Sequence, residues 1–186
     1  MRVICGAAKG RRLVAFKGRT IRPTSDKVRE AIFDILHGYF PFDRTLDIFA
    51  GTGAMGIEAM SRGVKEAAFI DVDRRAASLI KENLQRTGFS AQARIVPMDA
   101  IDGIKFLAAR GDRFDLVFID PPYDKLLTDR VFAAIEEREL LLPGGVIVSE
   151  SSKKFEVCVT PARLERFKEK VYGSTRVSFY ASPEEE

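Results

Sequence analysis

Short apolar runs alternate with segments of helical periodicity through most of this chain. From residue 45 onward each apolar run is typical of a buried strand, and each following segment repeats apolar residues at helical spacing. Glycines at positions 63, 88 and 111 end three of the helical segments. The expected strands are 46–49, 66–70, 94–97, 114–119 and 146–150, and the expected helices are 55–61, 74–86, 101–109 and 128–137. Such repeated strand–helix units predict an α/β fold with a mostly parallel sheet and helices on both faces.

The two ends of the chain follow a different pattern. Short strands at 2–5 and 12–16 predict an N-terminal β-hairpin, and a helix with one apolar face follows Thr24 or Ser25. A turn at Pro143-Gly144-Gly145 precedes the strand at 146, and segments 166–172 and 175–181 predict an antiparallel hairpin that completes a seven-stranded sheet. We expect a single domain over residues 1–186, made of a basic hairpin extension (1–22), an N-terminal helix (23–43), the sheet (44–182) and an acidic tail (183–186).

Composition restricts the class of protein. No apolar run approaches the roughly 20 residues that a membrane span requires, and the amino terminus lacks the apolar stretch of a secretory signal. With two cysteines and no export signal, we expect a cytoplasmic protein with free thiols and no membrane partner. His37 is the only histidine, which excludes a multi-histidine metal site and favours a surface or helix-end role for this residue.

The charge is distributed unevenly. Residues 1–22 contain seven Lys or Arg and no acid, so the remaining 164 residues sum to −4 against a total of +3. Such an asymmetry is typical of a basic arm that contacts phosphates, with Lys9, Arg11 and Arg12 as the candidate ligands. A solvated hairpin or a frayed terminus explains the composition equally well.

The segment Asp120-Pro121-Pro122-Tyr123 directly follows the apolar run 114–119. Prolines end the ladder and hold the backbone extended, which leaves carbonyl oxygens free to accept hydrogen bonds. A planar group with an exocyclic amine could stack on Tyr123 and donate to Asp120 and to the Pro121 carbonyl. This arrangement favours methylation of a base amino group, although Tyr123 could also simply pack at the rim of the sheet.

A glycine turn follows the first strand of the repeated units. Gly51, Thr52 and Gly53 allow a ligand to approach the backbone closely, and the next helix begins there with unpaired N–H groups. The match to G-x-G-x-x-G is weak by itself. Asp47 lies inside the apolar strand, where a carboxylate is costly unless paired, so it either caps the turn or meets a ligand ammonium.

Acidic residues also follow the next two strands. Asp71 is placed to accept hydrogen bonds from two ribose hydroxyls, with Val72 beside an adenine face. Asp99 is placed to accept the adenine amino group while the Ala100 N–H faces the ring, or else it caps a helix. Asp73 is better explained as a helix cap.

Together these features resemble a class I S-adenosylmethionine-dependent methyltransferase, which implies a Rossmann-like fold and S-adenosylmethionine as the cofactor. The resemblance extends from about residue 45 to residue 150. Phe49 departs from the pattern, because many members carry another glycine at this position. Gly51 and Gly53 are therefore expected to carry the turn.

A narrower resemblance covers nearly the whole chain. The segments 6–13, 22–30, 47–53, 120–123 and 172–175 are similar, in order, to those of the bacterial RsmD family. The resemblance implies a monomeric enzyme that methylates the exocyclic N2 amine of a guanine in 16S ribosomal RNA, on the small ribosomal subunit or an assembly intermediate. It also implies that Arg22, Thr24 and Arg29 lie over the cofactor pocket and substrate cleft, with Thr24 contacting the cofactor and Arg22 and Arg29 contacting RNA. Arg29 could instead be an exposed partner of Asp26 or Glu30.

Other functions remain open at this point. A methyltransferase acting on adenine N6 in DNA or RNA would need the same Asp-Pro-Pro-Tyr segment, because any exocyclic amine presents the same chemistry. An NAD-dependent oxidoreductase could use the glycine turn but would lack a Tyr-x-x-x-Lys proton donor. A nonenzymatic RNA-binding module would explain the basic arm and leave residues 120–123 without a role.

Overall fold

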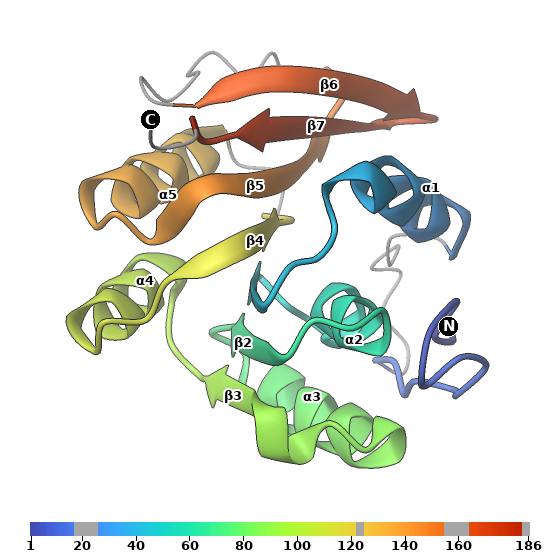
Figure 1. The fold of residues 1–186 in the computed structure, drawn as a ribbon. Coiled ribbons are helices and arrows are strands. Elements are labelled where there is room, and N and C mark those ends of the chain that lie inside the picture. Colours follow the sequence, from blue (N-terminus) through green and yellow to red (C-terminus); the bar gives the residue numbers. More distant parts are fainter. Residues whose placement is uncertain (17–25, 122–124, 155–163, 184–186) are drawn as a thin grey trace.

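The fold is a seven-stranded sheet in the order β3-β2-β1-β4-β5-β7-β6 (Figure 1). This computed structural model describes residues 1–16, 26–121, 125–154 and 164–183. Strands β1 to β5 run parallel, and β7 pairs antiparallel with both β5 and β6. The strands are β1 Arg44–Ile48, β2 Glu66–Ile70, β3 Ala93–Val96, β4 Phe114–Ile119, β5 Leu141–Ser152, β6 Glu165–Tyr172 and β7 Thr175–Ala181. The predicted α/β fold, its seven strands and its terminal hairpin are confirmed.

Helices cover both faces of the sheet, with α1, α2 and α3 on one side and α4 and α5 on the other (Figure 1). The helices are α1 Asp26–Leu36, α2 Ala54–Ser61, α3 Arg74–Thr87, α4 Ala100–Ala109 and α5 Lys125–Glu137, with short 3-10 turns η1 His37–Tyr39 and η2 Ser90–Gln92. Helices α2 to α5 begin within three residues of their predicted starts. The agreement is expected, because the apolar periodicity that predicts a helix also packs it against the sheet. His37 is exposed just after α1, as expected for a surface role.

The expected turn at Pro143-Gly144-Gly145 lies inside β5 and not before it, and Gly144 there has a left-handed φ of 69°. Strand β5 first pairs with β4 through Phe114 and Leu141, and the pairing resumes between Leu116 and Val146. The irregularity between these pairs accommodates the proline, which cannot donate to a ladder.

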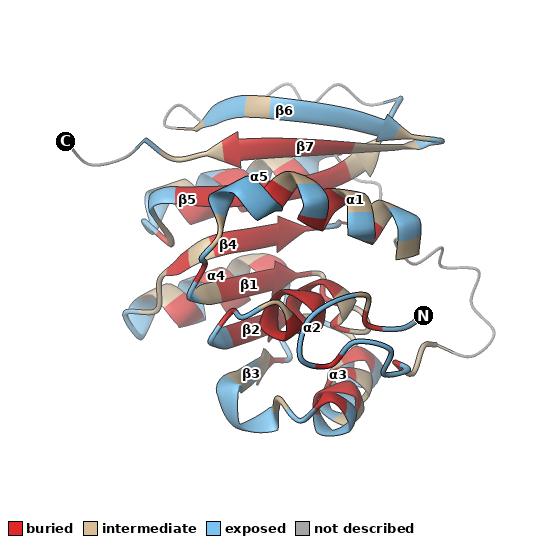
Figure 2. Ribbon diagram, turned by 45° about the vertical axis from the view of Figure 1, so that its right-hand side comes forward, coloured by how far each residue is buried: buried red, intermediate tan, exposed pale blue. Residues whose placement is uncertain are grey.

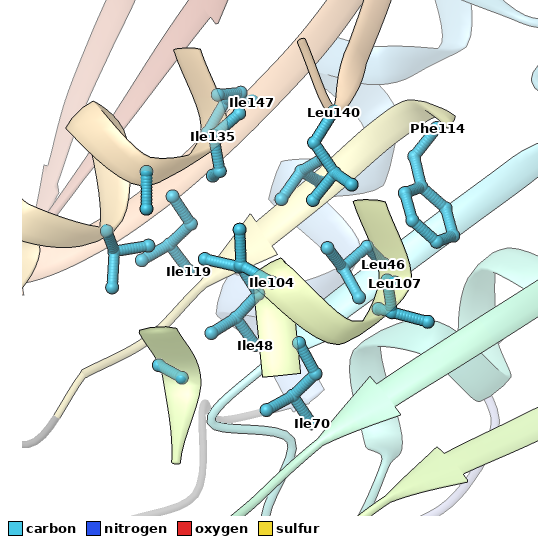
Figure 3. Packing of buried hydrophobic residues seen from close by; sticks show 14 of the residues in the cluster. Leu46, Ile48, Ile70, Ile104, Leu107, Phe114, Ile119, Ile135, Leu140 and Ile147 are labelled. Atoms are coloured by element: carbon cyan, nitrogen blue, oxygen red, sulfur yellow. The ribbon is translucent and has the colours of Figure 1, made fainter. Parts of the chain in front are cut away.

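The apolar core is divided by the sheet. Leu46, Ile48 and Ile70 point to the α4–α5 side, where they meet Ile104 and Leu107 of α4 (Figure 3). A second cluster on the opposite face joins β4, β5 and β7 to α1 and α2. Figure 2 shows that the central strands are buried while β6 at the edge is largely exposed.

The N-terminal arm, residues 1–16, forms less of a hairpin than the sequence predicts. It contains one antiparallel bridge, between Arg2 and Arg12, instead of two strands. The reason is that its peptide groups also bond to α2: the N–H groups of Ile4 and Cys5 both donate to the buried carboxylate of Glu58. The side chains of Val3, Ala8 and Leu13 are buried against α2 and α3. The arm is therefore part of the folded core, which excludes a frayed terminus.

The order of the strands creates a topological switch point between β1 and β4. From β1 the chain proceeds outward to β2 and β3, then returns to β4 on the other side of β1. In open α/β sheets, ligands bind outside the carboxyl ends of strands at such a point. Asp47 and Asp120 lie on these two strands or directly after them. Among the described residues, no helix has both the length and the apolar character to cross a membrane.

Candidate active site

The glycine turn connects β1 to α2 and has an unusual backbone. Gly51 and Gly53 have φ values of 55° and 75°, and Phe49 also adopts a left-handed φ of 64°. The Gly51 N–H donates to Asp71 Oδ2 at 2.8 Å, which fixes the turn to the end of β2. Gly51 and Gly53 supply left-handed backbone conformations in the turn, as expected. Phe49 also takes this conformation, which glycine adopts more easily.

Helix α2 begins at this turn and packs closely on β2. A Cβ atom on Gly56 would lie 2.5 Å from the ring of Phe69, so a larger residue would push the helix away from the sheet. The Gly56 N–H donates to Asp47 Oδ2 at 3.0 Å. This close approach sets the start of α2 beside the carboxyl end of β1.

Asp47 is buried, with 4% of its surface exposed. Burial raises the pKa of Asp47 to about 8, with smaller contributions from repulsion by Asp120 and Asp71, while the bond from Gly56 acts in the opposite direction. A nearby cation would favour the ionised form of this carboxylate. Asp47 thus has a structural role through the Gly56 N–H, and the ammonium group of a ligand is a partner that would ionise it.

Asp71 and Val72 follow β2 at the same end of the sheet. Asp71 accepts the N–H groups of Gly51 and Asp73, one on each oxygen, at 2.8 Å. Val72 is 71% exposed, which is unusual for a large apolar side chain and suits contact with a planar ring. Asp73 caps α3 by accepting the Arg75 N–H, as predicted.

Asp99 and Ala100 begin α4 after β3. Asp99 Oδ1 accepts the N–H groups of Ile101 and Asp102, so the carboxylate caps the helix. These bonds, led by the one from Asp102, lower the pKa of Asp99. Its side chain remains exposed. The capping role is therefore present, and it leaves a charged carboxylate accessible to a ligand.

Asp120 follows β4 directly, and its N–H donates to the Ile48 carbonyl at 3.5 Å. Asp120 is exposed to solvent, yet the surrounding protein removes enough water from its carboxylate to raise the pKa of Asp120 to about 6. A substrate can therefore reach this carboxylate. Pro121 is buried. Pro122, Tyr123, Thr24 and Arg22 lie outside the described residues.

The register of the central strands places one more acid beside Asp120, which the sequence did not single out. Ile119 pairs with Ser149, so Asp120 and Glu150 come next on adjacent parallel strands. Glu150 is 8% exposed. Its signal in the sequence was an acid near the end of an apolar run, two residues after Val148 and within β5.

The prediction that Arg29 contacts RNA is wrong. Its side chain is fully buried, and it donates to the Arg2 carbonyl and to Asp26 and lies 3.7 Å from Glu58. It therefore links α1, α2 and the N-terminal arm. Sequence reading favoured exposure because arginine is rarely buried unless it is paired, and the partner Glu58 is distant in sequence.

The basic residues of the arm that were expected to contact phosphates lie on its surface. Lys9, Arg11 and Arg12 are all exposed. Arg11 also donates to the Arg86 carbonyl at 2.8 Å, near the end of α3, which limits its freedom. Lys9 and Arg12 are therefore the more available cations of the three.

These features define the class of the protein. The strand order, the glycine turn after β1 and the acids after β2, β3 and β4 are those of a class I methyltransferase, and Asp47, Asp71 and Val72 fit S-adenosylmethionine, the cofactor of that class. The model of a family described as Conserved hypothetical protein 95 matches residues 1–181. The chain belongs to this family, which is the family of ribosomal RNA small subunit methyltransferase D.

Individual relatives resemble the chain along its whole length. YlbH of Bacillus subtilis is 38% identical over 180 residues, which cover 97% of this chain and 98% of the relative. Ribosomal RNA small subunit methyltransferase D of Haemophilus influenzae is 33% identical over 181 residues, covering 97% and 93% respectively. The solved structure of yhhF from Escherichia coli aligns with a TM-score of 0.86 at 32% identity, covering 100% of this chain and 99% of that one.

Proposed function

We propose that this protein transfers a methyl group from S-adenosylmethionine to the exocyclic N2 amine of a guanine in 16S ribosomal RNA of the small subunit. The observation that carries the proposal is the exposed carboxylate of Asp120, which has a raised pKa and lies one strand away from the buried Asp47. The ribosomal substrate is supported by relatives named ribosomal RNA small subunit methyltransferase D.

The cofactor would be held by the residues around the switch point. Gly51, Thr52 and Gly53 leave room for close approach to the backbone, and Asp47 would accept the ammonium of the amino-acid part. Asp71 would accept the ribose hydroxyls, since each carboxylate oxygen retains a second lone pair. Val72, Asp99 and the Ala100 N–H would contact the adenine.

The residues at the end of β4 would activate the acceptor amine. The lone pair of guanine N2 is delocalised into the ring, so the amine is a weak nucleophile. If Asp120 and the Pro121 carbonyl accept its two hydrogens, the nitrogen becomes more pyramidal and its lone pair can point at the methyl group. The sulfonium of S-adenosylmethionine supplies that methyl group in activated form. Positioning and electrostatics are therefore the protein's main contributions.

The methylated nitrogen would then lose a proton to Asp120 or to water. From the sequence, Tyr123 is expected to stack on the base, a contact worth about 1–3 kcal/mol in nucleic-acid binders. The base must leave its helix or loop to reach Asp120. Lys9, Arg11 and Arg12 would bind phosphates of the RNA. We expect the protein to act as a cytoplasmic monomer on a small subunit or an assembly intermediate.

The proposal is tested by methyl transfer from labelled S-adenosylmethionine to 16S RNA, and to small subunits, that lack the modification. We expect the label in N2-methylguanosine, and its loss by at least about a hundredfold in Asp120→Ala, which removes the acceptor of the amine hydrogen. Asp34→Ala is the matched control, because Asp34 is an exposed aspartate on α1. Label in N6-methyladenosine would identify an adenine methyltransferase instead.

A further inference from the structure

Asn83 is the only asparagine of the chain, and it is fully buried on α3. Its Oδ1 accepts the Val14 N–H at 2.7 Å. Its Nδ2 donates to the Val14 carbonyl at 3.0 Å and to the Thr52 carbonyl at 2.9 Å. One side chain therefore binds the N-terminal arm and the glycine turn together.

The orientation of the amide follows from these three bonds. A half-turn of the amide would place Nδ2 against the Val14 N–H and Oδ1 against two carbonyl oxygens, which would break all three. Both hydrogens of Nδ2 and a lone pair of Oδ1 are used in the observed orientation. Burial of an amide is costly without such partners, and Asn is a poor helix former. An apolar residue would fill this face of α3 with less cost, so packing alone does not explain Asn83.

The two backbones that Asn83 joins belong to the two proposed binding sites. Val14 lies on the arm that exposes Lys9 and Arg12, and Thr52 lies between the two glycines of the cofactor turn. The rest of the arm is attached at a distance from that turn, through Glu58 and Ser61 of α2. Figure 2 shows the N-terminal segment passing close to α2 and α3.

We propose that Asn83 is a positioning residue that couples RNA binding on the arm to cofactor binding at the glycine turn. The inference rests on the proposed function. RNA phosphates that hold the arm would restrict Val14 and, through Asn83, the Thr52 peptide, so the turn would lose less freedom when the cofactor binds. Coupling between two sites is reciprocal: each ligand raises the affinity for the other by the same factor, typically about 5–150-fold.

The coupling is measured with S-adenosylhomocysteine, which cannot transfer a methyl group. Its Kd is determined by equilibrium dialysis with and without saturating small subunits that lack the modification, and the ratio of the two values is the coupling factor. We expect a factor of at least about fivefold for the wild type and a factor near one for Asn83→Ala. Gln85→Ala is the matched control, because Gln85 is an exposed amide two residues further along α3, and it should retain the wild-type factor.

A second variant separates coupling from folding. Val14→Pro removes the N–H that donates to Asn83 Oδ1 and keeps the bonds that Asn83 Nδ2 donates to the Val14 and Thr52 carbonyls. It should therefore lower the coupling factor in part, even if Asn83→Ala does not fold. A folded variant of either kind with the wild-type factor would overturn the inference. The inference would also be overturned if the wild type methylates RNA but binds S-adenosylhomocysteine with the same Kd with and without subunits. The proposed function would stand in that case. Absence of RNA methylation would overturn the proposed function and the inference with it.

Discussion

At the scale of single residues, the carboxylates at the switch point differ in their access to solvent. Asp47 is buried and Asp120 is exposed, and the pKa values of both are raised mainly by loss of water. The groups therefore change charge within the working range of an enzyme, which is unusual for aspartate. Perturbed carboxylates gather at functional sites more often than elsewhere. This favours a role in catalysis or binding for both.

The raised pKa of Asp120, about 6, predicts the pH dependence of the proposed reaction. Asp120 accepts hydrogens from the amine only when ionised, and its ionised fraction falls as the pH drops through 6. We expect kcat/KM for RNA to rise with pH up to about 6 and to level off above it, because kcat/KM reports the groups of the free enzyme. The measurement is methyl transfer at low RNA concentration from pH 5 to pH 8. A profile that is flat between pH 5 and pH 7 would contradict the assignment.

Asp47→Asn should stabilise the protein and weaken the binding of cofactor. The folded pKa of about 8 lies above the unfolded value of 3.8, so the folded protein holds this proton more tightly. Stability from Asp47 is complete below about pH 4 and decreases as the pH rises through 8. Asparagine has no such cost and can still accept the Gly56 N–H.

The melting temperature of Asp47→Asn should therefore exceed that of the wild type by an amount that grows between pH 4 and pH 9. Each 1 kcal/mol corresponds to about 2–4 °C in a domain of this size. Binding of S-adenosylhomocysteine, measured by calorimetry, should weaken because its ammonium loses a charged partner. If the difference in melting temperature between Asp47→Asn and the wild type does not change with pH, Asp47 is not a buried acid with a raised pKa.

At the scale of elements, the N-terminal arm combines two roles. Its backbone is bonded to α2 through Glu58 and Ser61, and Gly6 approaches α2 so closely that a Cβ atom there would overlap the Ser61 carbonyl. With its backbone held in this way, the arm exposes its cations on the outer surface. A fixed set of cations loses less freedom on binding phosphates than a frayed terminus would.

Neutralising Lys9, Arg11 and Arg12 together should lower RNA affinity and flatten its dependence on salt. Each phosphate contact contributes about 0.7–0.9 to the slope of log K against log salt, so up to roughly 2–3 units of slope should be lost. Lys105→Ala is the control, because Lys105 lies on α4, away from the arm. The measurement is binding to 16S RNA at several salt concentrations. An unchanged slope would exclude the arm as a phosphate contact, and cofactor affinity without RNA should be unchanged.

At the scale of the whole molecule, the arm is packed into the apolar core beside the sheet. Its apolar residues pack with α2, α3 and β2 in one cluster, and Arg29 and Glu58 join α1 to α2 beneath the arm. Removing one partner of a buried ion pair is costly because it leaves the other charge unpaired. The arm and the methyltransferase fold should therefore unfold together.

Val3→Ala tests this arrangement against Val171→Ala. Val3 is 1% exposed under the arm, and Val171 is 53% exposed on the edge strand β6. Deleting two buried methyl groups should cost about 1–3 kcal/mol, whereas the exposed substitution should change stability by roughly 0.5 kcal/mol or less. The free energies are measured by urea unfolding. Equal effects of the two substitutions would mean that the arm lies outside the cooperative core.

The sequence by itself determined the fold class and the strands and helices of the seven-stranded sheet, and it predicted the chemistry at the end of β4. These depend on local patterns: the periodicity of apolar residues, glycines at turns, and acids and prolines directly after a strand. Asp71 and Asp99 could be located because parallel strands bring their carboxyl ends to one edge of the sheet. Phe49 illustrates a limit, since its left-handed backbone follows from the turn and not from its own preference.

The tertiary structure alone decided which polar residues are buried and what they join. Arg29 and Glu58 pair across 29 positions of sequence, and Asn83 meets Val14 across 69. Register likewise placed Glu150 level with Asp120. A charged or amide side chain has no periodic signal, because its burial depends on partners that only the folded chain brings within hydrogen-bonding distance.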